Sequence, residues 1–415
     1  MAEPRDPELP PEPPPQEPEK ARADMPVGGP TVFAGVSMRL GGVAVPFAAT
    51  LMAFAIGGLV VVITGANPFT AYRAIFEGTG FNWVFPWLDD ADRSRAARNL
   101  QQTLLVATPL MLTGLAVAFA FRCGLFNIGG QGQYWVGFIA ALWIGTNLEG
   151  LPRPLHVLLG IVAGIIGGAV WGGIAGLLRA TVGAHEVITT IMLNWIAIFG
   201  GRYLFELGGP LQGAVAALPR SDVVPDAARL WPIWGGNIQP LHAGIFVAFL
   251  GLLVYYVVLN RTTLGFEVRA VGFNPEAARY SGIPVRRSYF LALAISGAFA
   301  GTAGAVDVLG FKFAVDVSDL PASTVGFTGI AVALLGRNKP VGVLLAALLF
   351  ASLQVGTSSR QLDPRVFDPA LASDLSTMIQ ALVIFFVGAE VLILTLWSVR
   401  GRLGFGSRRV KESPS

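Results

Sequence analysis

Charged residues are scarce in this sequence: Asp, Glu, Lys and Arg make up 13% of its 415 residues, and 53% are hydrophobic. A soluble domain carries about 25% charged residues because its surface faces water, so the composition excludes an ordinary soluble protein. Charge is absent altogether from residues 40–72, 102–121, 123–148, 154–178, 230–260 and 340–359. A helix needs about 20 mostly apolar residues to cross a bilayer, whereas barrel strands alternate over about 10. The sequence therefore predicts an all-α, polytopic membrane helical bundle.

Residues that bind metals or nucleotides are equally few. Cys123 is the single cysteine, so no disulfide can form within the chain. The three histidines, His156, His185 and His242, lack the spacing of a metal site. The chain has no G-x-x-x-x-G-K-S/T segment, and no Gly-Lys pair at all, to bind ATP. We therefore expect no metal, no cofactor and no catalytic residue: the chain is not an enzyme, and its energy comes from a partner ATPase or an ion gradient.

The two ends of the chain differ in composition from the rest. Residues 1–30 contain ten prolines, seven acids and three bases, which predicts a disordered acidic tail with no core. The tail lacks the basic start and apolar run of a signal peptide, so it is expected to stay in the cytoplasm. Residues 401–415 form a basic tail, also expected in the cytoplasm. A transmembrane domain over residues 31–400 is predicted between them.

About ten membrane spans follow from the apolar stretches. They are predicted at 41–64, 102–121, 133–148, 155–178, 187–206, 241–259, 289–310, 322–336, 340–358 and 375–397. The third and eighth are short, and can be broken or re-entrant where protein or a cavity shields the backbone. Lys and Arg favour the cytoplasmic ends of spans, which places both termini in the cytoplasm and the longer loops 65–101 and 207–240 outside. Arg93, Arg95 and Arg98 in the first of these loops run against the rule.

The cytoplasmic loop at about 261–288 contains the start and stop signals of a short helix. Asn274 is a favourable N-cap, and Pro275 suits the first helical position because its missing N–H has no intrahelical partner there. Gly282 can adopt the left-handed conformation that closes a helix. These signals predict a helix over Pro275–Ser281. On local evidence alone, a capped connector explains them equally well.

Four separated segments resemble one family of membrane proteins. They read GLFNIGGQGQ at Gly124–Gln133, EVITTIMLNWI at Glu186–Ile196, LGFEVRAVGFNPEAARYSGIPVRRS at Leu264–Ser288 and GFTGIAVALLGRNKPVGVLLA at Gly326–Ala346. In order and spacing they are similar to ABC transporter inner-membrane permeases of the branched-chain amino acid/ribose type, nearest to the nucleoside and simple-sugar branch. The resemblance covers about residues 40–400. It implies a type II importer-like permease that moves its solute by alternating access.

The resemblance also implies partners. In that family the loop docks into a groove of the ATP-binding subunit, and this implies an ATPase-coupling role for Asn274, Pro275, Glu276, Ala277, Ala278, Arg279, Tyr280, Ser281 and Gly282. ATP and Mg²⁺ would bind to nucleotide-binding domains of that subunit. A second, related permease would pair with this chain in a heterodimer, and an extracytoplasmic solute-binding lipoprotein would deliver the solute. The complex would lie in the bacterial plasma membrane, with no role for nucleic acid.

Polar side chains within the predicted spans are candidates for the substrate pathway, because they are costly in lipid and usually face a cavity or another helix. The candidates are Asn127, Gln131, Gln133, Asn194 and Thr328. Structural bridging between helices is the alternative role. Gln131 and Thr328 stand where the family commonly has Glu and Asp, so the identity of the solute stays open.

Three classes of function remain. The favoured one is an ABC permease for a nucleoside or simple sugar, with another small polar solute, such as a branched-chain amino acid, as the alternative. An ion-coupled secondary transporter typically has carboxylates or cation sites within its spans, and the predicted spans are nearly free of carboxylates. A membrane enzyme needs a nucleophile or an acid–base pair, which the spans lack.

Overall fold

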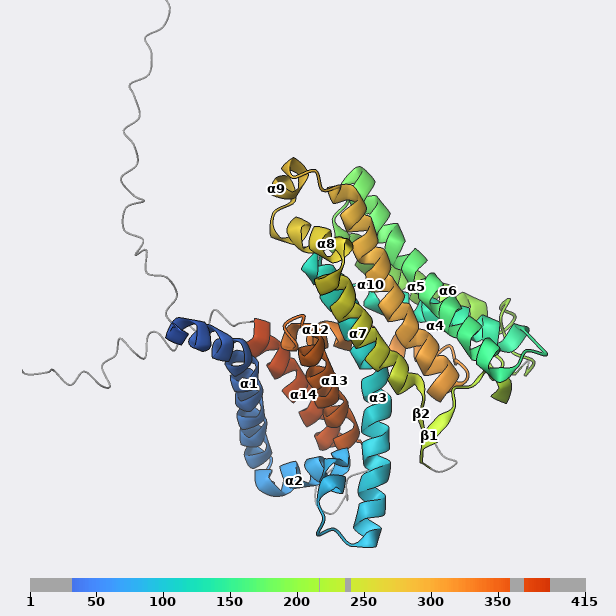
Figure 1. The fold of residues 1–415 in the computed structure, drawn as a ribbon. Helices are drawn as coiled ribbons and strands as arrows, with labels where there is room; N and C mark the ends of the chain where they lie inside the picture. Colours follow the sequence, from blue (N-terminus) through green and yellow to red (C-terminus); the bar gives the residue numbers. More distant parts are fainter. Residues whose placement is uncertain (1–31, 216, 236–239, 359–368, 389–415) are drawn as a thin grey trace, which may run out of the picture. The chain divides into compact units, whose positions relative to one another are not determined.

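The computed structural model describes residues 32–215, 217–235, 240–358 and 369–388. They belong to two units, residues 1–44 and 45–415, and the first contributes only the beginning of helix α1. The predicted tails, 1–30 and 401–415, lie outside the described residues. The helices are α1 Val32–Ile63, α2 Pro68–Thr79, α3 Asp90–Arg122, α4 Gly130–Asn147, α5 Arg153–Val182, α6 Glu186–Phe205, α7 Gly244–Arg261, α8 Thr263–Phe273, α9 Pro275–Tyr280, α10 Val285–Asp307, α11 Asp319–Ala322, α12 Val325–Leu335, α13 Pro340–Gly356 and α14 Pro369–Gly388 (Figure 1).

Shorter elements connect these helices. They are the 3-10 turns η2 Phe81–Val84 and η3 Asp226–Ala228, the π-helix η4 Val308–Lys312, and the strands β1 Pro232–Trp234 and β2 Leu241–His242. The two strands pair antiparallel and lead into α7. In Figure 1 this hairpin lies near one end of α7, and α8 and α9 lie beyond the other end. Within the described residues the fold is therefore α-helical, apart from this small hairpin and one isolated β-bridge between Arg220 and Asp316.

Six helices in the described part of the chain are long and apolar enough to cross a membrane. They are α1 from Pro46 onward, α3, α5, α6, α7 and the continuous run of α10 and η4. Three shorter apolar segments are Asp319–Leu335, α13 and Asp374–Val387. The prediction of a polytopic helical bundle is confirmed. The number of ten spans and the placement of the termini stay predictions, and the end of the tenth span lies outside the described residues.

The predicted outer loop 65–101 is mostly helical, and this corrects the sequence prediction. It contains α2 and η2, and α3 begins at Asp90 rather than at residue 102. The Asp89 side chain caps α3 by accepting a hydrogen bond of 2.7 Å from the Asp92 amide. A helix can extend beyond the lipid into polar sequence when its first turn is capped. The apolar stretch that starts at residue 102 therefore predicts the beginning of α3 too late.

The seventh and eighth predicted spans also end differently. Helix α10 does not stop at residue 310 but continues as the π-helix η4 to Lys312. The eighth span is two helices, α11 and α12, separated by Ser323 and Thr324. Such irregular backbone is stable at membrane depth only where protein or a cavity shields it. The π-helix η4 and the interruption between α11 and α12 therefore indicate where a shielded site or cavity should be sought.

Glycines set the packing at the centre of the fold. Helices α4, α5 and α10 pack against one another, and α3 contacts α10, α12 and α13. A Cβ atom added at Gly168 on α5 would lie 2.2 Å from the carbonyl oxygen of Gly297 on α10. One added at Gly137 on α4 would lie 2.3 Å from the Cα atom of Gly301. The three backbones therefore touch directly, as small residues permit in membrane helices.

Candidate functional site

The unwound segment between α3 and α4 is held by the amide of Asn127. Its Oδ1 accepts a hydrogen bond of 2.8 Å from the Gly129 amide. Its Nδ2 donates to Gln133 Oε1 at 2.9 Å and to the hydroxyl of Ser296 on α10 at 2.7 Å. Gln133 Nε2 donates back to Asn127 Oδ1 at 3.2 Å. Both amides are buried, and their bonds lie within the protein.

Gln131 and Asn194 satisfy backbone groups at helix breaks. Gln131 Nε2 donates to the Ser323 carbonyl at 2.9 Å, and its Oε1 accepts from the Gly326 amide at 2.7 Å, so this side chain joins the gap between α11 and α12 to α4. Asn194 on α6 makes the matching pair of contacts with α4 and the segment before it: it donates to the Ile128 carbonyl at 2.9 Å and accepts from the Gly132 amide at 2.7 Å. The bridging role that the sequence left open is thus visible. A role of these four amides in the substrate pathway stays a prediction.

Thr328, the fifth predicted pathway residue, lines a cavity of about 150 Å³. We call this space the α10–α12 cavity. Its walls are Leu105, Val106, Pro109, Leu110, Asp307, Phe311, Lys312, Thr324, Val325, Thr328 and Gln354. They come from α3, the end of α10, η4, α12 and α13. Thr328 is thus separate from the buried amides of Asn127 and Gln131, which do not line this cavity.

Asp307 is a functional candidate that the sequence analysis missed. It is the last residue of α10, it is buried, and the hydroxyl of Tyr134 on α4 donates a hydrogen bond to its carboxylate. Lys312 lies one turn of η4 further on, with its ammonium 5.4 Å from the centre of the Trp135 ring. The signal was present in the sequence, because an ionisable residue within a span is a functional candidate by default.

Three irregular helices surround the α10–α12 cavity. Pro109 lies within α3, where it cannot donate the helix hydrogen bond to the Leu105 carbonyl. The π-helix η4 closes with a bond of 3.0 Å from the Phe313 amide to the Val308 carbonyl, and Phe313 has a left-handed φ of 57°. The third is the interruption between α11 and α12. The cavity is thus bordered by irregular backbone in α3, in η4 and between α11 and α12, and by the ionisable side chains of Asp307 and Lys312. These groups are able to bind a polar solute.

The predicted outer loop 207–240 packs against the segment that follows η4. The Leu230 amide donates to the Leu309 carbonyl at 2.8 Å, and the Val224 amide donates to the Phe313 carbonyl at 2.7 Å. The Ser221 amide donates to the Val315 carbonyl at 2.9 Å. The loop thus supplies donors for carbonyl groups at and after the irregular helix end.

His242 supports the same end of α10. It is buried, and a Cβ atom added at Gly310 would come within 2.5 Å of its ring. Its Nδ1 accepts a hydrogen bond of 3.1 Å from the Gly244 amide. Burial lowers the pKa of His242 to about 4, because desolvation disfavours the charged imidazole. The ring is therefore neutral at pH 7 and acts as a packing element here.

The helix predicted over Pro275–Ser281 is present as α9, Pro275–Tyr280, with Ser281 as its C-cap. Asn274 Oδ1 accepts from the amides of Glu276 and Ala277, both at 3.0 Å. Gly282 follows with a φ of 82°. Each local signal in the sequence therefore has the predicted geometry. Whether α9 contacts an ATPase stays a prediction.

Exposure divides the predicted coupling residues into two groups. Ala278 is buried and faces the chain itself, where α9 contacts α8 and α10. Tyr280 is 93% exposed, and Phe273 at the end of α8 is 90% exposed. Large aromatic side chains in such positions are typical of surfaces that bind another protein. The outward face therefore carries the charged residues Glu276 and Arg279 as well as the two aromatic rings, whereas Ala278 packs α9 against its own chain.

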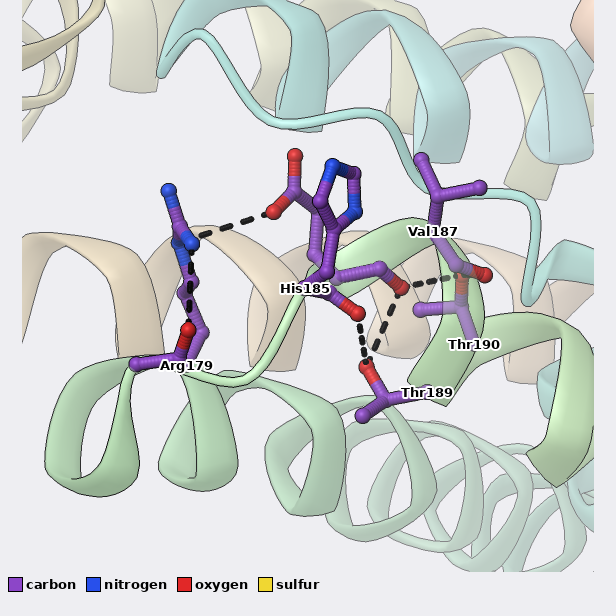
Figure 2. A network of polar contacts seen from close by, with 7 residues as sticks. Arg179, His185, Val187, Thr189 and Thr190 are labelled. Atoms are coloured by element: carbon purple, nitrogen blue, oxygen red, sulfur yellow. Dashed lines mark hydrogen bonds and ion pairs between the residues drawn. The ribbon is translucent and has the colours of Figure 1, made fainter.

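A polar cluster joins the turn between α5 and α6 to the start of α10. Arg179, in the last turn of α5, forms an ion pair with Glu186, with Nε and Oε2 3.5 Å apart. Figure 2 shows Arg179 beside the turn that carries His185. The Thr190 hydroxyl donates to the Glu186 carbonyl at 2.7 Å. The Arg179 guanidinium also lies 5.5 Å from the centre of the Tyr289 ring on α10. The cluster therefore links the ends of α5 and α6 to the start of α10.

Comparison with known proteins gives consistent matches over most of the chain. Residues 99–414 match the family described as branched-chain amino acid transport system/permease component. The guanosine ABC transporter permease protein NupP of Bacillus subtilis is 36% identical over 365 residues, which are 86% of this chain and 95% of that protein. The glucose ABC transporter permease protein TsgB13 of Haloferax volcanii is 37% identical over 379 residues, 89% and 92% of the two chains. A less similar relative, the guanosine ABC transporter permease protein NupQ of Bacillus subtilis, is 28% identical over 265 residues, 61% and 79%. No solved structure gives a significant match.

Proposed function

The chain belongs to the family of permease components of branched-chain amino acid transport systems, and we propose that it is the permease subunit of an ABC importer for a nucleoside or a simple sugar. The observation that carries the proposal is its likeness, over nearly the whole length of both chains, to permeases named for guanosine and for glucose. A branched-chain amino acid is the alternative solute, because the family takes its description from that class.

The energy for transport comes, in this proposal, from a separate ATP-binding subunit that holds ATP and Mg²⁺. That subunit binds the exposed aromatic face of α8 and α9, formed by Phe273 and Tyr280. Residues Asn274 to Gly282 couple its motion to the membrane helices, because α9 leads directly into α10. The Arg179–Glu186 cluster next to Tyr289 passes the same motion to α5 and α6.

Two further partners complete the complex. Bacillus subtilis has both NupP and the less similar NupQ, two permeases with the same named solute, which favours a heterodimer of related permeases over a pair of identical chains. A solute-binding lipoprotein docks outside, chiefly on the predicted outer loops 65–101 and 207–240. The pathway between the two faces runs past Asn127, Gln131, Gln133, Asn194 and Thr328, in the plasma membrane of a bacterium.

The first test identifies both the partners and the solute. The tagged chain is purified with its associated subunits, reconstituted in vesicles with the receptor, and assayed for uptake of tritiated guanosine, glucose and leucine. We expect uptake of guanosine or glucose that requires ATP and receptor and persists when ionophores collapse the ion gradients. Uptake of leucine alone would establish the alternative solute. Uptake that follows an ion gradient without ATP would overturn the ABC assignment.

A further inference from the structure

We propose that the α10–α12 cavity is a binding site for the hydroxylated ring that nucleosides and simple sugars share. The inference rests on the proposed function and deepens it, because it assigns solute-binding groups to Asp307 and Lys312, which lie outside the family motifs quoted above. It begins from the ionisable residues at the irregular end of α10, Asp307 and Lys312, which both line the cavity.

The polar groups of the cavity suit a solute with many hydroxyls. Asp307 is an acceptor, held in place by the Tyr134 hydroxyl, and Lys312 is a donor. Thr324, Thr328 and Gln354 add side chains that can both donate and accept. Phe311 and the aliphatic residues of α3 provide apolar surface for the C–H faces of a ring. A few convergent polar groups in an apolar wall are the usual construction of a small-molecule site.

The charge of the cavity favours a neutral solute. One carboxylate and one ammonium line it, so their formal charges cancel. A phosphate or a solute with a net positive charge would bring an unbalanced charge into a cavity with partly apolar walls, and its partial loss of water is costly. A zwitterionic amino acid would balance both charges. It would, however, leave the two threonine hydroxyls and the Gln354 amide without obvious partners.

The size of the cavity limits what it holds. Its volume of about 150 Å³ lies below the roughly 300–1,000 Å³ of sites that enclose a drug-sized ligand. A single five- or six-membered ring is the matching fragment, and the base of a nucleoside would extend beyond the cavity. This accounts for one feature of the relatives, whose names cover both guanosine and glucose.

The test measures how much the hydroxyl groups of the solute increase its rate of uptake. The maximal uptake rates of guanosine and of 2′,3′-dideoxyguanosine are measured in the complete complex, with the receptor saturated by each solute. The quantity compared between variants is the uptake ratio, the rate of guanosine divided by the rate of its dideoxy analogue. If the solute is glucose, a dideoxyglucose takes the place of the analogue. A hydrogen bond to a charged group is worth about 1.5–3 kcal/mol, so we expect a ratio of at least about ten in the wild type. In Asp307→Asn and Lys312→Met the ratio should fall below about three.

The ratio is independent of how much complex assembles, so a poorly expressed variant remains informative. Thr328→Val, which keeps the shape and removes one hydroxyl, is a milder variant expected to lower the ratio as well. Asp316→Asn and Lys339→Met, at exposed positions outside the cavity, are matched controls expected to keep the wild-type ratio.

Three results would overturn the inference. The first is an unchanged ratio in all three cavity variants, which would leave the proposed function intact. The second is uptake of leucine that depends on Asp307 and Lys312, which would assign the cavity to amino acids. The third is a wild-type complex that carries neither guanosine nor glucose, which would remove the proposed function and this site together.

Discussion

Buried amides in this protein complete hydrogen bonds that broken helices leave unmade. Gln131 is the clearest case, because its two ends satisfy an acceptor at Ser323 and a donor at Gly326 across the gap between α11 and α12. The family commonly has Glu where this chain has Gln131. A Glu would have to be protonated to donate to the Ser323 carbonyl, whereas Gln does so at any pH. The departure from the family pattern is therefore compatible with the same local structure.

Replacing Gln131 by Leu should destabilise the protein, because the Ser323 carbonyl and the Gly326 amide lose their partners at about 1–3 kcal/mol each. Melting of the purified protein in detergent measures the loss, and uptake per folded complex measures any role in the pathway. Gln131→Glu, which keeps the acceptor for Gly326, should be the milder change. An unaltered melting temperature in Gln131→Leu would refute the bridging role.

The sequence identifies the buried amide residues better than it identifies their hydrogen-bond partners. Asn127, Gln131, Gln133 and Asn194 stand out because amides are rare in apolar stretches. Gln131 and Asn194 bind backbone atoms as far as 195 residues away, and Asn127 binds the hydroxyl of Ser296, 169 residues away. No local pattern encodes these partners. Asp307 lies in the predicted span 289–310, where an ionisable residue is a functional candidate by default. Its importance is nevertheless revealed only by its contact with Tyr134 and its place in a cavity wall.

Among the elements, α9 could be predicted and η4 could not. The bounds of α9 follow from Asn274, Pro275 and Gly282, whose preferences act within a few residues. The π-helix has no such signal. Its carbonyl at Leu309 receives a hydrogen bond from Leu230 in the outer loop, so the irregular turn depends on a contact far along the chain. Local rules predict elements that are locally stabilised.

Exposure decides which substitution tests coupling through α9. Ala278→Arg would force a charged side chain into the buried contact of α9 with its own chain and disturb the loop. Tyr280→Ala instead removes only an exposed ring. We expect it to leave the melting temperature of the permease within about 1–2 °C, since exposed substitutions change stability little, and to lower receptor-stimulated ATP hydrolysis and uptake together. Full coupling in Tyr280→Ala would show that α9 binds the ATPase through another face.

Over the whole molecule, direct backbone contact between α4, α5 and α10 sets the arrangement of the helices. Sequence analysis identifies the abundance of glycine, 51 residues in 415, but not which glycines meet. Gly168 and Gly200 have the same local appearance within apolar helices. Only Gly168 has a backbone atom of another helix within 3 Å of an added Cβ, whereas Gly200 has no atom within 4 Å.

These two glycines make a matched pair for a test of packing. Gly168→Ala should force α5 away from α10 and cost about 1–3 kcal/mol, the usual effect of overpacking. Gly200→Ala should leave stability unchanged or raise it by up to about 1 kcal/mol, because alanine favours the helix. Thermal melting of both variants in one detergent gives the comparison. Equal melting temperatures would show that the helices separate without cost.

The direct contact of α10 with α5 has a mechanical consequence. With η4, α10 forms a run of 28 residues from Val285 to Lys312, about 40 Å long at 1.5 Å per residue. Where the glycine backbones of α5 and α10 touch, no side chains lie between the two helices that could rearrange to let one helix rotate against the other. A tilt of about 5° imposed at the α9 end would therefore move the Lys312 end by about 3.5 Å, enough to make or break a hydrogen bond of about 3 Å. In the proposed mechanism the pair of helices would act as a stiff lever arm, whose length would convert a small displacement at α9 into a larger one beside the α10–α12 cavity.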